Sequence, residues 1–146
     1  MNYPEPCVGA VIVRDDGKIL LATSPKWHGE WIIAGGHVDI GETIAHALKR
    51  EIKEELNIEV EPVRLLKVQD FINDPSFHEK KHFIFLDFLC RYVSGEVKVD
   101  GRELTEYQWI APEESLKINI DGYTRKVVEA YLSELPCYDY ESRKPE

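Results

Sequence analysis

The sequence has few cysteines, and their spacing suits neither a disulfide framework nor a zinc site. Cys7, Cys90 and Cys137 lie far apart, with no CxxC pair and no Cys/His spacing, which is typical of a reducing compartment. The amino end has no basic stretch that leads into an apolar one, so we expect no secretory signal. No apolar run approaches the roughly 20 residues that a membrane-spanning helix needs. We therefore expect a cytoplasmic protein without a membrane partner.

Positive charge is also scarce. Lysine and arginine number 18 against 27 aspartates and glutamates, which gives a formal net charge of -9. Nucleic-acid backbones repel such a chain, so a polymeric DNA or RNA partner is not expected. An anionic small ligand stays possible if a metal ion supplies positive charge. Repeats and low-complexity segments are absent, and 146 residues suffice for one core. We expect a single domain over residues 1–136 and a loose polar tail over 137–146.

Apolar runs and turn residues alternate along the chain as in an α/β domain. Runs at 7–13 and 18–23 flank Asp-Asp-Gly, which predicts a β-hairpin. Apolar residues at helical spacing predict a helix over 43–56, and Asp121 is placed to cap a second helix to about residue 135. Further strands are expected at residues 31–34, 60–71, 81–93 and 104–110. This order predicts a mixed β-sheet covered by helices on both faces.

Three glutamates of the first helix fall on one face. Glu51, Glu54 and Glu55 stand at i, i+3 and i+4. They lie beside the apolar stripe of the helix, which consists of Ala45, Leu48, Ile52 and Leu56. Such carboxylates repel one another, and a hard divalent cation, Mg²⁺ or Mn²⁺, would reverse that repulsion. A solvated surface with an ordinary Arg50–Glu54 ion pair is the alternative.

The residues before this helix favour the metal. Gly35-Gly36 and Gly41-Glu42 form a glycine-punctuated approach to it, and glycines let a backbone come close to a ligand. From Gly36 the chain reads five residues, Glu42, seven residues, then Arg50-Glu51-Ile52-Lys53-Glu54-Glu55-Leu56-Asn57-Ile58.

This pattern resembles the signature of the Nudix hydrolases, Gly-x5-Glu-x7-Arg-Glu-U-x-Glu-Glu-x-Gly-U, where U is a bulky aliphatic residue. Eight of its nine defined positions match over 23 residues. Asn57 replaces the last glycine and is the next best residue for a left-handed helix end. Ala34 stands where a proline commonly precedes the two glycines. The likeness covers roughly residues 5–133.

The resemblance implies an α/β/α sandwich that hydrolyses a nucleoside diphosphate linked to another group. It implies metal ligands at Glu51, Glu54 and Glu55, with Glu42 supporting the loop or a second metal. Arg50 would orient these carboxylates, and Glu54 would also take part in catalysis. Substrate would meet residues of the glycine loop and its strand: Gly35, Gly36 and Trp31. Homodimers are common in the family.

The general base and the substrate are left open by the sequence. The base lies either among the signature residues or outside them, where Glu103 and Glu106 are the candidates; both could instead be solvated charges at a strand edge. Compact size favours a nucleoside triphosphate pyrophosphohydrolase acting on NTP or dNTP. The alternatives are a nucleotide-sugar or ADP-ribose hydrolase, and an inactive nucleotide-binding sensor. Pro75 is offset from the position that favours ADP-ribose.

Overall fold

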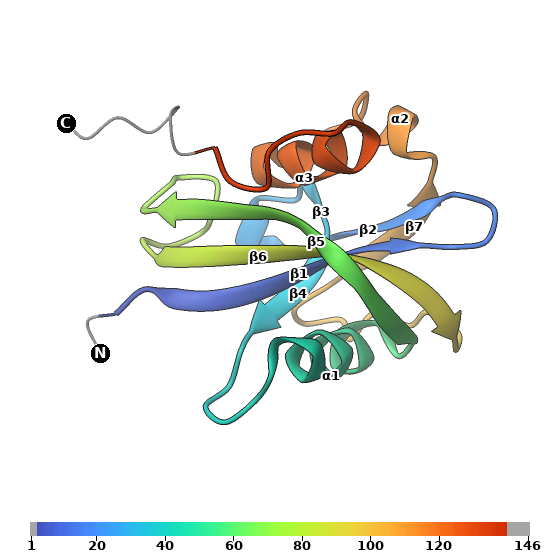
Figure 1. Ribbon diagram of the computed structural model, residues 1–146, viewed down its shortest axis with the longest axis horizontal. Coiled ribbons are helices and arrows are strands. Elements are labelled where there is room, and N and C mark those ends of the chain that lie inside the picture. The colour runs from blue at the N-terminus through green and yellow to red at the C-terminus, as the bar shows by residue number, and fades with distance from the viewer. Residues whose placement is uncertain (1–2, 140–146) are drawn as a thin grey trace.

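A seven-stranded mixed sheet forms the centre of the computed structural model, which describes residues 3–139 (Figure 1). The strands are β1 (Glu5–Val13), β2 (Ile19–Thr23), β3 (Trp31–Ile32), β4 (Ala34–His37), β5 (Glu59–Ile72), β6 (His82–Ser94) and β7 (Glu106–Ile110). Their order is β3-β2-β1-β6-β5, while β4 also pairs with β1 and β7 with β2. β1 and β6 run parallel, and the other pairs are antiparallel.

Strand β1 is the central strand, and its sequence explains why. Residues from Cys7 to Ile12 are all buried or, like Gly9, enclosed between neighbours, as expected for a strand covered on both faces. The Asp-Asp-Gly turn that follows closes the predicted hairpin, because Arg14 N donates to Lys18 O at 3.0 Å. Val13 then pairs with Ile19. The hairpin prediction is confirmed.

The glycine pair lies within a strand, and not after one as predicted from the sequence. The expected strand at 31–34 divides into β3 and β4, and Gly35 and Gly36 pair with Gly9 and Val8 of β1. A Cβ on Gly35 would lie 1.9 Å from Val8 O. Only a residue without a side chain allows this close approach, so the glycines extend β4 toward the first helix.

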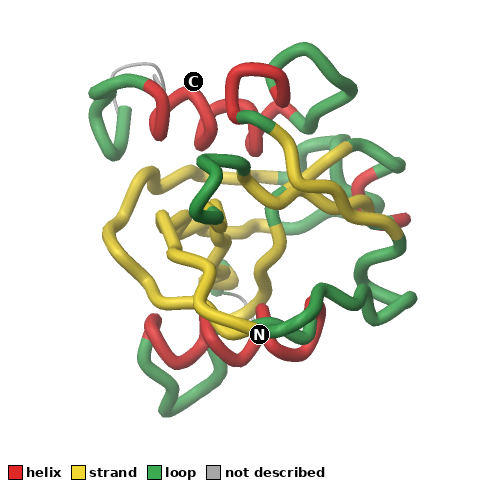
Figure 2. The backbone as a smooth tube through the Cα atoms, turned by 90° about the vertical axis from the view of Figure 1, so that its right-hand side faces the viewer, coloured by secondary structure: helices red, strands yellow, loops and turns green. Residues whose placement is uncertain are grey.

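Two helices cover opposite faces of the sheet, as Figures 1 and 2 show, with the strands between α1 and α3. α1 spans Ile44–Leu56 and buries Leu48, Ile52 and Leu56. α3 spans Gly122–Leu132, is capped by Asp121, and buries Val127 and Val128. The short elements are the 3-10 helix η1 (Pro25–Trp27) and α2 (Pro112–Ser115). The mixed sheet and the α/β/α layering are confirmed.

Two helix details differ from the prediction. α3 ends at Leu132, three residues before the expected end, because the backbone at Ser133 is extended. Ala47 faces the core of the sheet, and Ala45, which the apolar stripe had included, is exposed. The cap at Asn57 agrees: its φ is 64° and its N–H bonds to Lys53 O.

The chain after α3 returns to the edge strand β5. Val68 N donates to Cys137 O at 2.8 Å, and the Tyr138 hydroxyl donates to Asp70 at 2.5 Å. Cys137 and Tyr138 therefore lie against the sheet; residues 140–146 of the expected loose tail lie outside the described residues. Among the residues described, no helix is long and apolar enough to span a membrane.

Candidate active site

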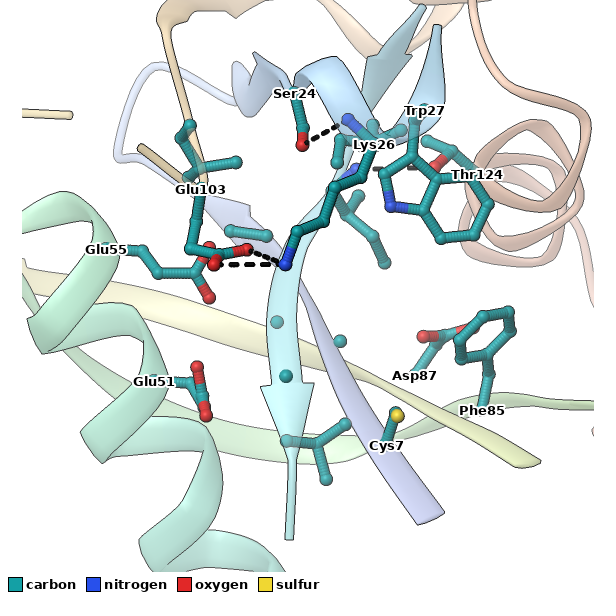
Figure 3. Close-up of a pocket in the computed structure, with 18 of the residues that line it drawn as sticks. Cys7, Ser24, Lys26, Trp27, Glu51, Glu55, Phe85, Asp87, Glu103 and Thr124 are labelled. Atoms are coloured by element: carbon teal, nitrogen blue, oxygen red, sulfur yellow. Dashed lines mark hydrogen bonds and ion pairs between the residues drawn. The ribbon is translucent and has the colours of Figure 1, made fainter. Parts of the chain in front are cut away.

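One cavity of about 410 Å³ opens beside β4 and joins two kinds of surface. Acidic side chains from α1 and the loop before β7 line one end. Aromatic side chains line the other end, with Asp87 among them. Figure 3 shows Glu51, Glu55 and Glu103 on one side of the β4 ribbon and Phe85 and Asp87 on the other. A ligand in this cavity would therefore meet two chemically different regions.

The three signature glutamates of α1 all line the acidic end, but their environments differ. The side chain of Glu54 is 60 % exposed, that of Glu51 is 16 % exposed, and Glu55 as a residue is 6 % exposed. Burial raises the pKa of the Glu55 carboxyl, and the neighbouring Glu51 carboxylate raises it further. The site thus contains a buried carboxyl whose ionisation needs a nearby cation.

Arg50 ties these carboxylates to the loop before the helix. Its guanidinium donates to both oxygens of Glu42, at 2.6 and 2.9 Å. It also donates to Glu51 at 2.9 Å and to Glu54 at 3.3 Å, and to the backbone oxygen of His37 at 3.0 Å. Glu42 itself does not line the cavity; the bond from Arg50 lowers the pKa of Glu42 to about 2. Arg50 therefore orients the carboxylates at the acidic end of the cavity.

Gly35 and Gly36 also line the cavity, in the part beside α1. A Cβ on Gly36 would lie 2.3 Å from the Glu51 carboxyl carbon. The absent side chain leaves the space that Glu51 fills, so Gly36 positions a carboxylate as well as exposing backbone.

The structure separates the two glutamates considered as a base outside the signature. Glu103 lines the cavity and pairs with Lys26 of η1, with Lys26 Nζ 2.9 Å from Glu103 Oε2. Glu106 begins β7, is exposed, and is not among the cavity residues. Lys26 brings a positive charge to the acidic end of the cavity.

Trp31 lies away from the cavity. It packs against the apolar cluster formed with α3, and its N–H bonds to Asn119 O at 2.9 Å. The tryptophan that lines the cavity is Trp27, whose ring is 4.9 Å from that of Phe77 and 6.2 Å from that of Phe85. The aromatic residues of this end are Trp27, Phe77, Phe83, Phe85 and Tyr123.

Sequence reasoning missed three acidic residues that line the cavity, which are Asp87, Asp100 and Asp121. Asp87 interrupts the most apolar strand run, a charge in Phe-Leu-Asp-Phe-Leu, and that was the available signal. Asp121 was assigned only as a helix cap. No motif pointed to Asp100, whose backbone N–H donates to Glu55 O at 3.1 Å.

The donor set fits a hard divalent cation in its chemistry. Carboxylate oxygens dominate the acidic end, and a polyphosphate there would be repelled unless a cation lay between. Within residues 3–139 no three such side chains stand in a metal-binding arrangement, and Arg50 bonds to both Glu51 and Glu54. Glu51, Glu54 and Glu55 are the residues that would hold the ion.

Comparison with known proteins agrees with this geometry. The NUDIX domain model matches residues 4–131. The nucleoside triphosphatase NudI of Escherichia coli K12 is 32% identical over 130 residues, which cover 80% of this chain and 89% of NudI. The NAD-capped RNA hydrolase NudC of Vibrio atlanticus is 35% identical over 112 residues, 75% of this chain. This chain spans only 39% of that NudC and 50% of the NudC of Vibrio parahaemolyticus.

Solved structures agree as well. The MutT Nudix hydrolase of Burkholderia pseudomallei superposes with a TM-score of 0.76 at 33% identity, covering 88% of this chain and 98% of that one. A MutT protein of Methanosarcina mazei Go1 gives a TM-score of 0.76 at 27% identity, covering 92% and 97%. The signature residues, the sandwich and these matches lead to one assignment. The chain belongs to the Nudix hydrolase family.

Proposed function

We propose that this protein hydrolyses nucleoside triphosphates or deoxynucleoside triphosphates, with Mg²⁺ or Mn²⁺, to a nucleoside monophosphate and pyrophosphate. The observation that carries the proposal is the single cavity with an acidic end and an aromatic end. Phosphates and their cation match the first end, and a nucleobase matches the second, because aromatic rings offer faces on which a base stacks.

Each signature residue has a role in this proposal. Glu51, Glu54 and Glu55 hold the divalent ion, and Arg50 keeps the carboxylates oriented through the bonds described above. When bound, the ion neutralises phosphate charge and lowers the pKa of a coordinated water. Glu42 supports the loop by fixing Arg50, since its carboxylate faces Arg50 and not the cavity.

Glu103 is the general base that we propose. Its carboxylate oxygen accepts a proton from the attacking water. The water oxygen bonds to the α-phosphorus, and the bond from that phosphorus to the pyrophosphate oxygen breaks. Lys26 faces Glu103 at 2.9 Å and is the side chain placed to meet a phosphate oxygen. Glu106 has no place in this scheme, because it is remote from the cavity.

Two other functions remain as alternatives. The name NudI, a nucleoside triphosphatase, supports the triphosphate; the name NudC, an NAD-capped RNA hydrolase, supports a dinucleotide-type diphosphate as runner-up. A nucleotide sugar or ADP-ribose belongs to the same alternative. An inactive nucleotide sensor is disfavoured, since all three metal-type glutamates are present and line one cavity.

A product screen tests the proposal. The purified chain would be given NTPs, dNTPs, ADP-ribose, nucleotide sugars and dinucleoside polyphosphates with Mg²⁺, and Glu54→Gln serves as the inactive control. We expect metal-dependent release of nucleoside monophosphate from triphosphates. Turnover confined to ADP-ribose, sugars or dinucleotides would move the assignment to the runner-up. Nucleotide binding without any turnover would support the sensor.

A further inference from the structure

Asp87 is a buried carboxyl at the aromatic end of the cavity, on the other side of the β4 ribbon from Glu51 and Glu55 (Figure 3). It belongs to β6 and pairs across the parallel ladder with Gly9 of β1. It is 5 % exposed, yet it lines the cavity. The rings of Phe85 and Trp27 lie near it in Figure 3. An ionisable group here costs folding energy, because its charged form leaves water for an apolar surrounding.

Neighbouring residues satisfy only part of the hydrogen-bonding capacity of the Asp87 carboxyl. Gln69 Nε2 donates to Asp87 Oδ2 at 3.3 Å and to Tyr123 O at 2.9 Å. The other oxygen, Oδ1, lies over Gly9, where a Cβ would be 2.4 Å from it. Gly9 also lines the cavity. The missing side chain at residue 9 therefore makes room for Oδ1 at the cavity wall.

A second acceptor lies at the same end. Asp121 is 2 % exposed, and its Oδ2 caps α3 by accepting from Tyr123 N and Thr124 N, both at 3.0 Å. Its Oδ1 is buried and has no hydrogen-bond partner among residues 3–139. The negative charge of Asp121 acts on Asp87, so the two carboxyls share one environment. A buried acceptor without a donor calls for a ligand that supplies one.

We propose that Asp87, with Asp121 as a second acceptor, selects nucleotides whose base carries an exocyclic amino group. This inference rests on the proposed function, because it takes the aromatic end as the base site. Amino N–H groups donate to carboxylate oxygens. The 4-carbonyl oxygen of uracil or thymine would face those oxygens without a proton between them, and hypoxanthine has only a hydrogen where guanine has its 2-amino group. Guanine matches best, since its N1–H and N2–H groups are adjacent donors.

A purely structural role would leave the base selectivity unaffected. In that case Asp87 would serve only to hold Gln69, and the cavity would stack any base. The two readings separate cleanly with ligand pairs that differ in one amino group, namely GTP against ITP and CTP against UTP. Comparing such a pair changes the ligand and leaves the fold of the protein untouched.

The experiment measures kcat/KM for both pairs with wild type, Asp87→Asn and Asp70→Asn, the last being a matched control on β5 outside the cavity. We expect wild type to prefer the amino member of at least one pair by roughly 10- to 100-fold, as for a hydrogen bond to a charged group. Asp87→Asn should bring the CTP-to-UTP ratio close to one, because its amide also donates to a carbonyl. It should lower the GTP-to-ITP ratio, because the hydrogen bond from the 2-amino group no longer goes to a charged oxygen. Asp70→Asn should keep the ratio.

Equal rates for the paired ligands in wild type, or a preference that survives in Asp87→Asn, would overturn the proposal while leaving the hydrolase intact. Binding of GMP and IMP to wild type without metal, measured by calorimetry, provides an independent readout. If no triphosphate is turned over, the proposed function fails, and this calorimetric ratio still decides the selectivity. The same ratio decides it if Asp87→Asn does not fold.

Discussion

Glu54 and Glu55 are adjacent in the sequence, yet one side chain faces solvent and the other is enclosed. Glu54 is 60 % exposed and makes one long bond to Arg50, at 3.3 Å. Its loss should therefore affect a bound metal and leave the core intact. As an exposed signature glutamate, Glu54 is the best single residue for separating chemistry from folding.

Glu54→Gln should lower kcat by roughly 100-fold or more, since a lost metal ligand removes several kcal/mol of charge stabilisation. The thermal unfolding midpoint should stay within about 2 °C of wild type, as for an exposed surface change. Glu103→Gln should lower kcat comparably if Glu103 is the base. Glu59→Gln, an exposed glutamate after α1, is the control. Near-normal turnover in Glu54→Gln would show that the metal site is assigned wrongly.

Alanine substitutions at Gly35 and Gly36 should have different effects: the first should mainly lower stability, and the second should mainly lower activity. A Cβ at Gly36 meets the flexible end of Glu51, while a Cβ at Gly35 meets the backbone oxygen of Val8. Gly36→Ala should displace a carboxylate, cut activity at least about tenfold and change stability little. Gly35→Ala should destabilise the fold by about 1–3 kcal/mol, because backbone must shift. Steady-state kinetics and urea unfolding of both variants check this, and equal effects at the two positions would contradict it.

The sequence predicted the direction of some side chains but not all of their contacts. The spacing of Glu51, Glu54 and Glu55 was enough to place them on one face, because helical periodicity fixes direction. It could not predict that Arg50 would also reach Glu42 or that Asp87 would join the cavity. The Arg50–Glu42 contact depends on the path of the loop before α1, which helical periodicity does not describe. The place of Asp87 depends on pairing with a distant strand, and a strand pattern does not reveal which residue of another strand lies opposite.

At the scale of elements, α1 was the easiest to predict. Thr43 caps it by accepting from His46 N at 3.1 Å, and Asn57 ends it in the left-handed region. Both helix ends depend on residues that are close in the sequence, so they can be predicted from it. The division of 31–37 into β3 and β4 was missed, because the glycines there take their conformation from pairing with β1 and not from any local preference.

The left-handed end of α1 gives a prediction of its own. Asn57 has φ 64° and its Nδ2 donates to Glu96 O at 3.2 Å. Asn57→Ala should destabilise the protein by about 1 kcal/mol, the cost of a left-handed conformation for a residue with a plain Cβ. Asn57→Gly should change stability by less than about 0.5 kcal/mol. Urea unfolding measures both; an alanine variant as stable as the glycine variant would refute the cap.

For the whole molecule, the layered architecture followed from the order of elements, whereas the path of the chain end did not. Cys137 and Tyr138 bond to Val68 and Asp70 of the edge strand β5, and no pattern in the sequence indicated this. The homodimer suggested by the family stays a prediction, which sedimentation of the purified chain would decide.

The buried Asp87 carboxyl should make the stability of the whole protein depend on pH. Burial raises the pKa of this carboxyl to about 7, above its value in an unfolded chain of about 3.9. The folded state therefore holds the proton more tightly, and this group lowers stability progressively as pH rises from about 4 to about 7. Above that window the loss is complete and constant.

Asp87→Asn should consequently be more stable than wild type at pH 8, by up to about 4 kcal/mol. The gain should shrink as pH falls toward 4, because the folded-state carboxyl is then neutral and the unfolded-state carboxyl is increasingly protonated. Urea unfolding of both proteins at pH 8 and pH 4.5 measures the difference. A gain that is the same at both pH values, or absent at pH 8, would show that Asp87 is not held in a charge-excluding site.

The central claim is hydrolysis between the α- and β-phosphates of a nucleotide at the acidic end of this cavity. Phosphorus NMR of a triphosphate incubated with wild type and Mg²⁺ tests it most directly. We expect resonances of a nucleoside monophosphate and pyrophosphate, which should be absent when the metal is chelated and in Glu54→Gln. Appearance of a nucleoside diphosphate and inorganic phosphate, or turnover that is indifferent to chelation, would contradict it.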